Sequence, residues 1–453
     1  MTHTSTASVA PGRSALADAP ILPTLLRLTV PNLAAMVVIA LVAICETAYA
    51  GLLGTAPLAA IALVFPMAML MQMLSAGAIG GGISSAISRA LGAGDIARAN
   101  ALAFHATLIG AALGVFFSAT FLAFGAPILR TLGASGAVLS EALTYANIAL
   151  TGAVLTWLLN TLASIVRGTG NMRVPSLTLL AASGLQIVLG GALGLGLGPI
   201  PRFGLTGVAA GIVVSSTAAT LFLFWFLRAG RGRLTLRLDA PLNREMLLDI
   251  LKVGAVSALG PLQTVLTVLI LTRLVAGFGT EALAGYGIGA RLEFLLVPIV
   301  FAVGVASVPM VGMAMGARDV TRARRVAWTA AGVAMTALGA IGMVVMVAPD
   351  LWSGLFTADA RVRAAANLYL RWAGWGFAFV GLSLSLYFAS QGSGKVLPPV
   401  LAGTARLAVV ALGGLWLAAG AAPLWAIFGW VGAAMAASGL GVAAAVLLTP
   451  WQG

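Results

Sequence analysis

The phrases GAGDIARA (residues 92–99) and GARDVTRA (residues 316–323) are nearly the same, although the rest of the chain carries little charge. A glycine, an aspartate and an arginine recur in both at an offset of 224 residues. They are Gly92, Asp95 and Arg98 in the first copy and Gly316, Asp319 and Arg322 in the second. In each copy the aspartate is placed to cap the following helix and the arginine to anchor a loop at a membrane surface; the alternative is a gate latch.

Three further pairs of segments repeat in the same order. GTAPLAA (54–60) corresponds to GTEALAG (279–285), RGTGNMRVP (167–175) to QGSGKVLPP (391–399), and FGLTGVAA (203–210) to FGWVGAAM (428–435), at offsets of 224 or 225. Four matching anchors in one order indicate that the chain is a duplicated unit of about 225 residues.

The composition places this duplicated unit in a membrane. Of the 453 residues, 60% are hydrophobic and 8% charged, and the mean hydropathy is +1.06. A soluble globule needs more polar surface than this, whereas a spanning helix needs about 20 mostly apolar residues. We predict twelve spans that begin near residues 31, 58, 100, 138, 175, 205, 250, 283, 323, 364, 397 and 426.

The predicted fold is therefore an all-α integral membrane protein with two six-helix bundles. Because each half has an even number of spans, both point the same way, and a pseudo-twofold axis along the membrane normal should relate them. The predicted boundaries are a disordered cytoplasmic tail (1–20), an N-lobe (21–228), a cytoplasmic linker (229–249) and a C-lobe (250–453). Such repeats are typical of solute carriers that open alternately to each side.

The basic residues predict the orientation in the membrane. With a cytoplasmic N-terminus, 17 of the 25 Lys and Arg residues fall on the inner side, and four (Arg130, Arg202, Arg361 and Arg363) fall outside. This bias follows the positive-inside rule and puts both termini in the cytoplasm. The net charge of +13 is spread along loops, so we expect no nucleic-acid partner.

Taken together, the motifs resemble the multidrug and toxic compound extrusion (MATE) family over residues 22–448. The resemblance is carried by Glu46 and Thr47 leading to GLLGTAPLAA, by GAGD, by RGTGNMRVP and FGLTGVAA, and by their second-half copies. It implies a secondary antiporter that exports amphipathic, often cationic, compounds. Major-facilitator carriers share the span number, but their loop after the second span has a basic residue directly after the aspartate, where this chain has Ile96.

Glu46 is the candidate coupling residue, because it is the one carboxylate deep in a span of the first half. Burial favours the neutral form of a carboxyl group, which allows it to carry a proton. The resemblance assigns an aspartate at this position to proton or sodium coupling, with helpers whose places are taken here by Gln186 and Gly190. A single acid favours H⁺ over Na⁺. The alternative is a structural Glu46 that stays hydrogen-bonded to Thr47 or Gln186.

The second half departs from the family pattern, because residues 253–280 and 364–391 contain no Asp or Glu. Its spans instead hold Arg273, Arg291, Arg371 and Arg406, with Glu293 as the one buried counter-charge. Arg291 and Glu293 are two positions apart on a helix and point to different sides. These groups either form an internal network with Glu293 or present a basic wall to substrate.

Several other polar side chains are candidates for the substrate cavity. They are Gln72, Asn160, Gln263 and Tyr286, together with Arg291, Glu293, Arg371 and Arg406. An isolated amide in a bundle commonly joins helices instead. His105 is either a proton relay or a hydrogen-bonded structural group.

We therefore expect a proton-coupled multidrug efflux antiporter in a bacterial inner membrane. It should act as a monomer, without a metal or cofactor, and contact only small amphipathic substrates and lipids. The alternative function is a flippase or exporter of anionic or lipid-linked substrates that uses the arginines of the C-lobe. A membrane enzyme would need an acid, histidine or metal cluster, which the two histidines and scattered carboxylates do not supply.

Overall fold

The computed structural model describes residues 19–451, and these contain helices and loops but no strand. The predicted tail therefore lies, up to residue 18, outside the described part. Eleven helices within it are long and apolar enough to cross a membrane. A twelfth span is a pair, α6 (Gly136–Thr151) and α7 (Ala153–Gly168), bent by 41°. The twelve predicted spans are thus accounted for.

The remaining helices of the first half and the loop after it follow in chain order. They are α2 (Ile21–Leu53), α3 (Thr55–Gln72), the π-helix η1 (Met73–Ile79), α4 (Gly80–Gly92), α5 (Ile96–Thr131), α8 (Arg173–Leu195) and α9 (Leu205–Arg228). Helices α3, η1 and α4 form one span. The predicted start of the first span near residue 31 was ten residues late, because α2 continues through Pro31.

The second half has the same order of spans. It comprises α10 (Arg244–Ser257), α11 (Leu259–Ala276), α12 (Thr280–Gly316), α13 (Val320–Val347), α14 (Asp350–Ser353), α15 (Ala360–Ala373), the 3₁₀ turn η2 (Gly374–Gly376), α16 (Phe377–Ser393), α17 (Leu397–Ala419) and α18 (Leu424–Leu448). Helices α10 and α11 make one span, as do α15 to α16. Helix α10 begins within the predicted linker of residues 229–249, where Asn243 caps it by accepting the N–H of Glu245.

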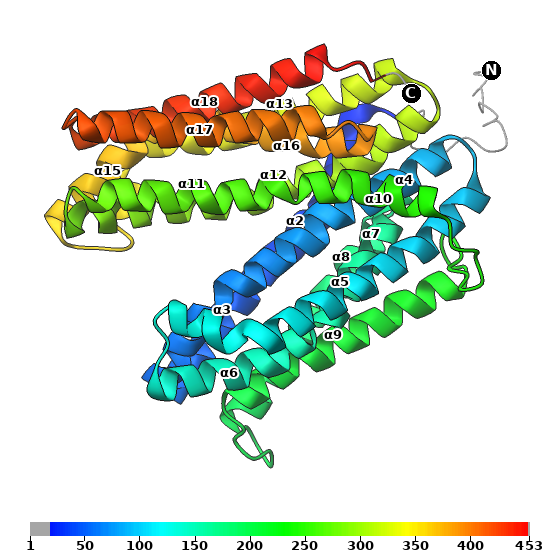
Figure 1. The fold of residues 1–453 in the computed structure, drawn as a ribbon, viewed down its shortest axis with the longest axis horizontal. Helices are drawn as coiled ribbons and strands as arrows, with labels where there is room; N and C mark the ends of the chain where they lie inside the picture. The colour runs from blue at the N-terminus through cyan, green and yellow to red at the C-terminus, as the bar shows by residue number, and fades with distance from the viewer. Residues whose placement is uncertain (1–18, 452–453) are drawn as a thin grey trace, which may run out of the picture.

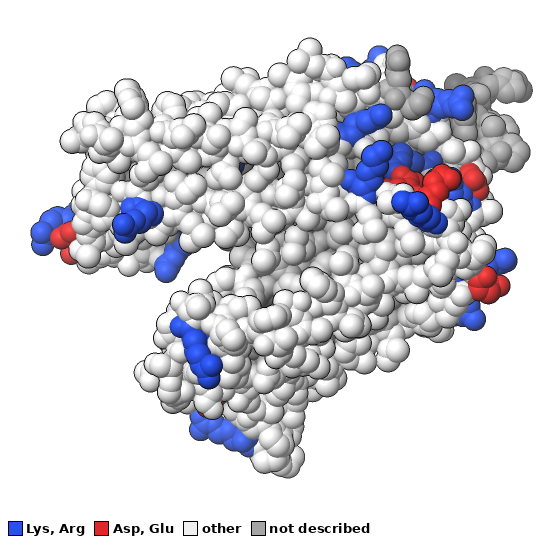
Figure 2. Space-filling view, viewed as in Figure 1, with Lys and Arg blue, Asp and Glu red and all other residues white. Residues whose placement is uncertain are grey.

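Two separate hydrophobic cores define the lobes. One is built mainly from the first half and the other mainly from the second. Figure 1 shows the two bundles diverging from one end of the molecule, where α2 begins and α18 ends. We call this the closed end, and the opposite end, where the bundles are apart, the open end. Figure 2 shows a deep cleft between the lobes at the open end, and most of the visible charged side chains gathered at the closed end.

Helix α2 belongs to both lobes. Leu25 and Leu28, near its start, lie in the core of the C-lobe, and the Asn32 amide donates to the Ala302 carbonyl of α12 (3.3 Å). Further along, α2 packs against α8 of the N-lobe. A shift of α2 relative to α8 would therefore change the packing of α2 in both lobes.

Candidate functional site

Glu46 lies inside the N-lobe, between α2 and α8. Its Oε1 accepts a hydrogen bond of 2.6 Å from Nε2 of Gln186, and the side chain is half-buried. Tyr145 of α6 and Tyr49 of α2 are near enough to interact electrostatically with the carboxyl group. The structure therefore brings together two of the three predicted coupling residues.

Thr47 is the third, and it points elsewhere. Its hydroxyl donates to the Ala43 carbonyl of its own helix (2.8 Å), and the residue is exposed. Gly190, at the position of the second helper, is buried where α8 meets α9 beside Gly211. In residues 19–451 no group of three or more His, Cys, Asp or Glu side chains is placed to hold a metal ion. Glu46 thus has one neutral amide as its hydrogen-bond partner.

Asn160 of α7 joins three helical segments of the N-lobe. Its amide donates to Gln72 Oε1 (3.1 Å) on α3 and to Ser75 Oγ (2.9 Å) on η1, and it is 2% exposed. Of the two roles considered for such amides, Asn160 therefore has the one that joins helices. Sequence reasoning missed Ser75, which lies in the π-helix η1, a feature that is frequent at functional sites but appears only in the structure.

The C-lobe holds a polar cluster on α12, α15 and α17. The hydroxyl of Tyr369 donates to the Glu293 carboxylate, and the ring of Tyr286 meets that of Tyr369 edge-on at 5.4 Å. Arg406 interacts electrostatically with Glu293 and Tyr286, but its Nε has no hydrogen-bond partner within the described residues. The predicted Glu293 network therefore forms chiefly through Tyr369, which the sequence analysis did not select.

The other predicted cavity residues of this lobe are separate from that cluster. Arg291 is exposed and lies over the ring of Phe356 (5.7 Å), so it and Glu293 do face different sides of α12. Arg371 is exposed on α15. Gln263 joins α11 to α17 by donating to Thr404 Oγ1 (2.8 Å) and the Val400 carbonyl (3.2 Å).

The repeated phrases of the sequence meet each other at the closed end. A Cβ on Gly92 would overlap the Met313 carbonyl of α12, and a Cβ on Gly316 would overlap the Arg89 carbonyl of α4. Met313 is the repeat counterpart of Arg89, so this crossing of α4 and α12 follows the pseudo-twofold relation. Only glycine permits backbones to approach this closely.

The aspartates of these phrases are helix caps, as predicted. Asp95 Oδ1 accepts the N–H of Arg98, and Asp319 Oδ1 that of Arg322, at 2.8 Å each. The Arg98 guanidinium instead reaches α10, where it contacts Glu245 (3.0 Å) and Asp249 (3.5 Å). Arg89 also pairs with Asp249 (2.5 Å). We call these four side chains the α10 clasp.

Gln391, buried on α16, is a further contact between the lobes that sequence reasoning missed. Its side-chain amide donates to the Gly77 carbonyl (3.3 Å) and to Ser257 Oγ (3.1 Å), and its backbone carbonyl accepts from the hydroxyl of Ser85 on α4. The signal was available, because Gln391 begins the repeated QGSG segment.

His105 has a structural position. It is fully buried, and its Nε2 accepts the N–H of Asn243 (2.8 Å), while Nδ1 lies 2.8 Å from the Ala101 carbonyl. The acceptor role of Nε2 puts the proton of the neutral ring on Nδ1. His105 therefore fixes the start of α10, where Glu245 and Asp249 are carried.

Comparison with known proteins adds a decisive observation. The MatE family model matches the chain twice, over residues 31–191 and 257–417, two segments that begin 226 positions apart. Together they cover well over half of the 453 residues. The chain belongs to the MATE family of efflux transporters. The double match also confirms the duplication, and a MATE transporter is not an enzyme.

The relatives of this MATE protein have names that indicate different transported compounds. A FAD transporter of Shewanella oneidensis is 29% identical over 315 residues, 69% of each chain. The multidrug export protein MepA of Staphylococcus aureus is 28% identical over 375 residues, 78% of each chain. A probable multidrug resistance protein of Bacillus subtilis, YoeA, is 25% identical over 77% of this chain and 76% of its own.

Solved structures share the whole architecture. One is the outward-facing conformation of a multidrug resistance MATE transporter, with a TM-score of 0.85, 26% identity and 97% coverage of both chains. Another is a MOP superfamily transporter from Pyrococcus furiosus, with a TM-score of 0.86, 25% identity and coverage of 96% and 97%; a reverse polarity of its binding pocket has been described as suggesting a different function. The MATE protein is thus a multi-pass membrane protein with the predicted two-bundle fold.

Proposed function

We propose that this MATE protein exports amphipathic, often cationic, organic compounds in exchange for protons. The observation that carries the proposal is the hydrogen bond between Glu46 and Gln186 inside the N-lobe. One carboxyl group with one amide partner suits a proton, whereas a hard metal cation is held by several oxygen ligands. By the same reasoning, Na⁺ is the less favoured candidate for the coupling ion.

The orientation follows from the arginines. The loops at the closed end carry most of the basic residues, so the positive-inside rule places this end, with both termini, at the cytoplasmic face. The membrane is then the bacterial inner membrane, and the cleft in Figure 2 opens outward. The likeness to an outward-facing MATE structure supports the same assignment.

In the proposed cycle a proton enters from the open cleft and neutralises Glu46. Neutralisation changes the hydrogen bond with Gln186 and so the packing of α2 on α8. Because Leu25, Leu28 and Asn32 tie α2 to the C-lobe, the change reaches both bundles. Substrate leaves outward, and proton release to the cytoplasm returns the N-lobe to its charged form.

The test is gradient-driven export of a cationic dye from proteoliposomes. We expect Glu46→Gln to insert normally but to lose transport under a proton gradient, while Glu281→Gln, which alters an exposed carboxylate at the open end, transports like the wild type. Wild-type rates from Glu46→Gln would rule out the coupling role. Export driven by a sodium gradient alone would identify Na⁺, instead of H⁺, as the coupling ion.

An anionic or lipid-linked substrate is the second candidate. It is favoured by the Arg291, Arg371 and Arg406 side chains of the C-lobe and by the FAD transporter among the relatives. Under this alternative, FAD would be exported by the same vesicles, and Arg371→Gln would reduce FAD export more than dye export. Equal effects on both cargoes would argue against a basic substrate wall.

A further inference from the structure

A cavity of about 900 Å³ lies at the closed end, away from the cleft. The start of α2, the loop between α7 and α8, and the end of α9 with its following loop form its walls. Four arginines line it: Arg27, Arg173, Arg231 and Arg233. Among residues 19–451, no Asp or Glu lines it. The described walls of the cavity therefore carry a concentration of positive charge.

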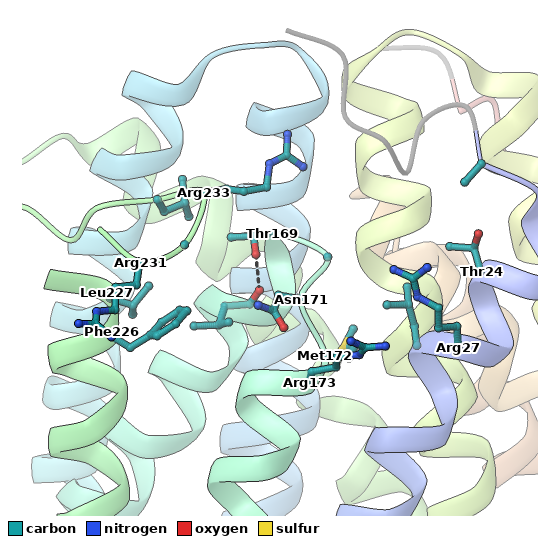
Figure 3. Close-up of a pocket in the computed structure, with 16 residues that line it drawn as sticks. Thr24, Arg27, Thr169, Asn171, Met172, Arg173, Phe226, Leu227, Arg231 and Arg233 are labelled. Carbon is teal, nitrogen blue, oxygen red and sulfur yellow. Dashed lines mark hydrogen bonds between the residues drawn. The ribbon is translucent and has the colours of Figure 1, made fainter. Parts of the chain in front are cut away.

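Arg27 and Arg173 are the centre of this charge. Figure 3 shows them extending toward each other from α2 and α8. Within residues 19–451 neither makes an ion pair with a carboxylate. Arg231 differs, because its guanidinium stacks on the ring of Trp225 (4.4 Å). Both arginines are exposed to the cavity, and an anion placed between them would be attracted by two positive charges at once.

A phosphate group matches this arrangement. A guanidinium presents a planar fork of N–H donors that binds phosphate oxygens in pairs, and these charge-assisted hydrogen bonds are stronger than neutral ones. The cavity volume is within the range of about 300–1,000 Å³ usual for small-molecule sites. Thr24 and Asn171 add polar atoms beside the two arginines.

The surroundings favour a lipid as the source of the phosphate. Helices α2, α8 and α9 cross the membrane, so their ends at the cavity lie at the level of lipid headgroups. Leu28, Met172 and Phe226 supply apolar walls next to the arginines, as a glycerol backbone with acyl chains requires. Basic pockets between spans at the cytoplasmic face are suited to anionic headgroups.

We propose that this cavity binds the phosphate of an anionic phospholipid between Arg27 and Arg173. The bound headgroup connects the lobes, because Arg27 is next to Leu28 in the C-lobe core while Arg173 begins α8 of the N-lobe. It therefore holds the closed end together. This site is independent of the coupling ion and of the exported compound.

The test uses the purified full-length protein in a neutral detergent. Phosphatidylglycerol, phosphatidylcholine or inorganic phosphate is added, and bound molecules are counted by native mass spectrometry. We expect the wild type to retain phosphatidylglycerol and the variant Arg27→Gln/Arg173→Gln to bind it at least about tenfold more weakly, since two charge-assisted contacts are lost. Arg237→Gln/Arg325→Gln is the matched control, because it removes two exposed charges that do not line the cavity.

Each outcome decides the proposal. Loss of phosphatidylglycerol in the cavity variant, with retention in the control, supports it. Equal retention by both variants overturns it. Tight binding of inorganic phosphate that displaces the lipid would also overturn it, in favour of a soluble phosphate compound. If the double variant fails to fold, Arg173→Lys, which keeps the charge but loses the planar fork, is expected to show a smaller loss than Arg173→Gln.

Discussion

Gln186 is the hydrogen-bond partner of Glu46 inside the N-lobe, and its N–H donor favours the ionised form of the carboxyl group. Its Nε2 donates 2.6 Å from the carboxylate, and no second acid shares the position that Gly190 occupies. For a partly buried carboxylate, the loss of one hydrogen-bond donor costs about 1–3 kcal/mol. In the proposed cycle, the deprotonated state of Glu46 therefore depends on this amide.

Replacement of Gln186 tests that dependence. We expect Gln186→Ala to slow proton-driven dye export in proteoliposomes by about tenfold, because a loss of 1.4 kcal/mol corresponds to a factor of ten. Thr47→Val is the control, since the Thr47 hydroxyl bonds only its own helix at Ala43. A larger loss from Thr47→Val than from Gln186→Ala would contradict this assignment of roles.

At the scale of helices, α10 is the element that the clasp attaches to the N-lobe. It packs on α4 and η1, although its sequence continues into α11 of the C-lobe. His105 fixes its first turn, and Arg89 and Arg98 fix Asp249 and Glu245. The pair of Arg98 with Glu245 is largely exposed and contributes about 0–1 kcal/mol, whereas Arg89 and Asp249 are partly buried. Arg98 should therefore adjust the closed end without being essential to it.

Charge reversal measures the strength of the clasp. We expect Arg98→Glu to open the closed end only modestly, by at most about fivefold in population, because the pair with Glu245 is exposed. The readout is the distance between spin labels at Ser135→Cys and Ala358→Cys, both in open-end loops, in a Cys45→Ser background. Arg98→Glu/Glu245→Arg should restore the wild-type distribution, and Arg325→Glu should leave it unchanged. A failure of the swap to restore it would show that the pairing is not responsible.

At the scale of the whole molecule, backbone packing between α4 and α12 holds the lobes together. Gly92 of α4 packs against the backbone of α12, and Gly316 of α12 packs against the backbone of α4. Gln391 and Ser85 add a hydrogen bond between the lobes. Overpacking a contact of this kind costs about 1–3 kcal/mol. This is larger than the contribution of about 0–1 kcal/mol from the largely exposed pair of Arg98 with Glu245, so we expect the glycine crossing to affect the balance between the two ends more than that pair does.

A methyl group at that crossing should shift the balance between the two states. We expect Gly316→Ala to favour opening of the closed end by about fivefold to 150-fold. The same spin labels should then report a shorter distance across the open end. Gly332→Ala is the control, because a Cβ there meets no atom within 4 Å. An unchanged distance in Gly316→Ala would mean that the closed end does not limit the exchange of states.

The polar sites show where sequence reasoning is weakest. Glu46 and Gln186 were found because an acid and an amide in an apolar span are conspicuous. Tyr369 and Ser75 were missed because such residues are ordinary in membrane helices until a partner is known. The placement of Asn160 also needed the structure, because an amide that joins helices and one that lines a cavity look the same in sequence.

The sequence by itself determined the membrane fold, the twelve spans and the duplication, because hydropathy and internal repeats are properties of the chain order alone. It also marked Asp95 and Asp319 as caps, since capping is local. Only the tertiary structure decided that α4 and α12 cross at Gly92 and Gly316, and that Arg98 reaches α10. It also decided that Arg27 and Arg173 line one cavity. These contacts join residues far apart in sequence, and helix packing in three dimensions sets them.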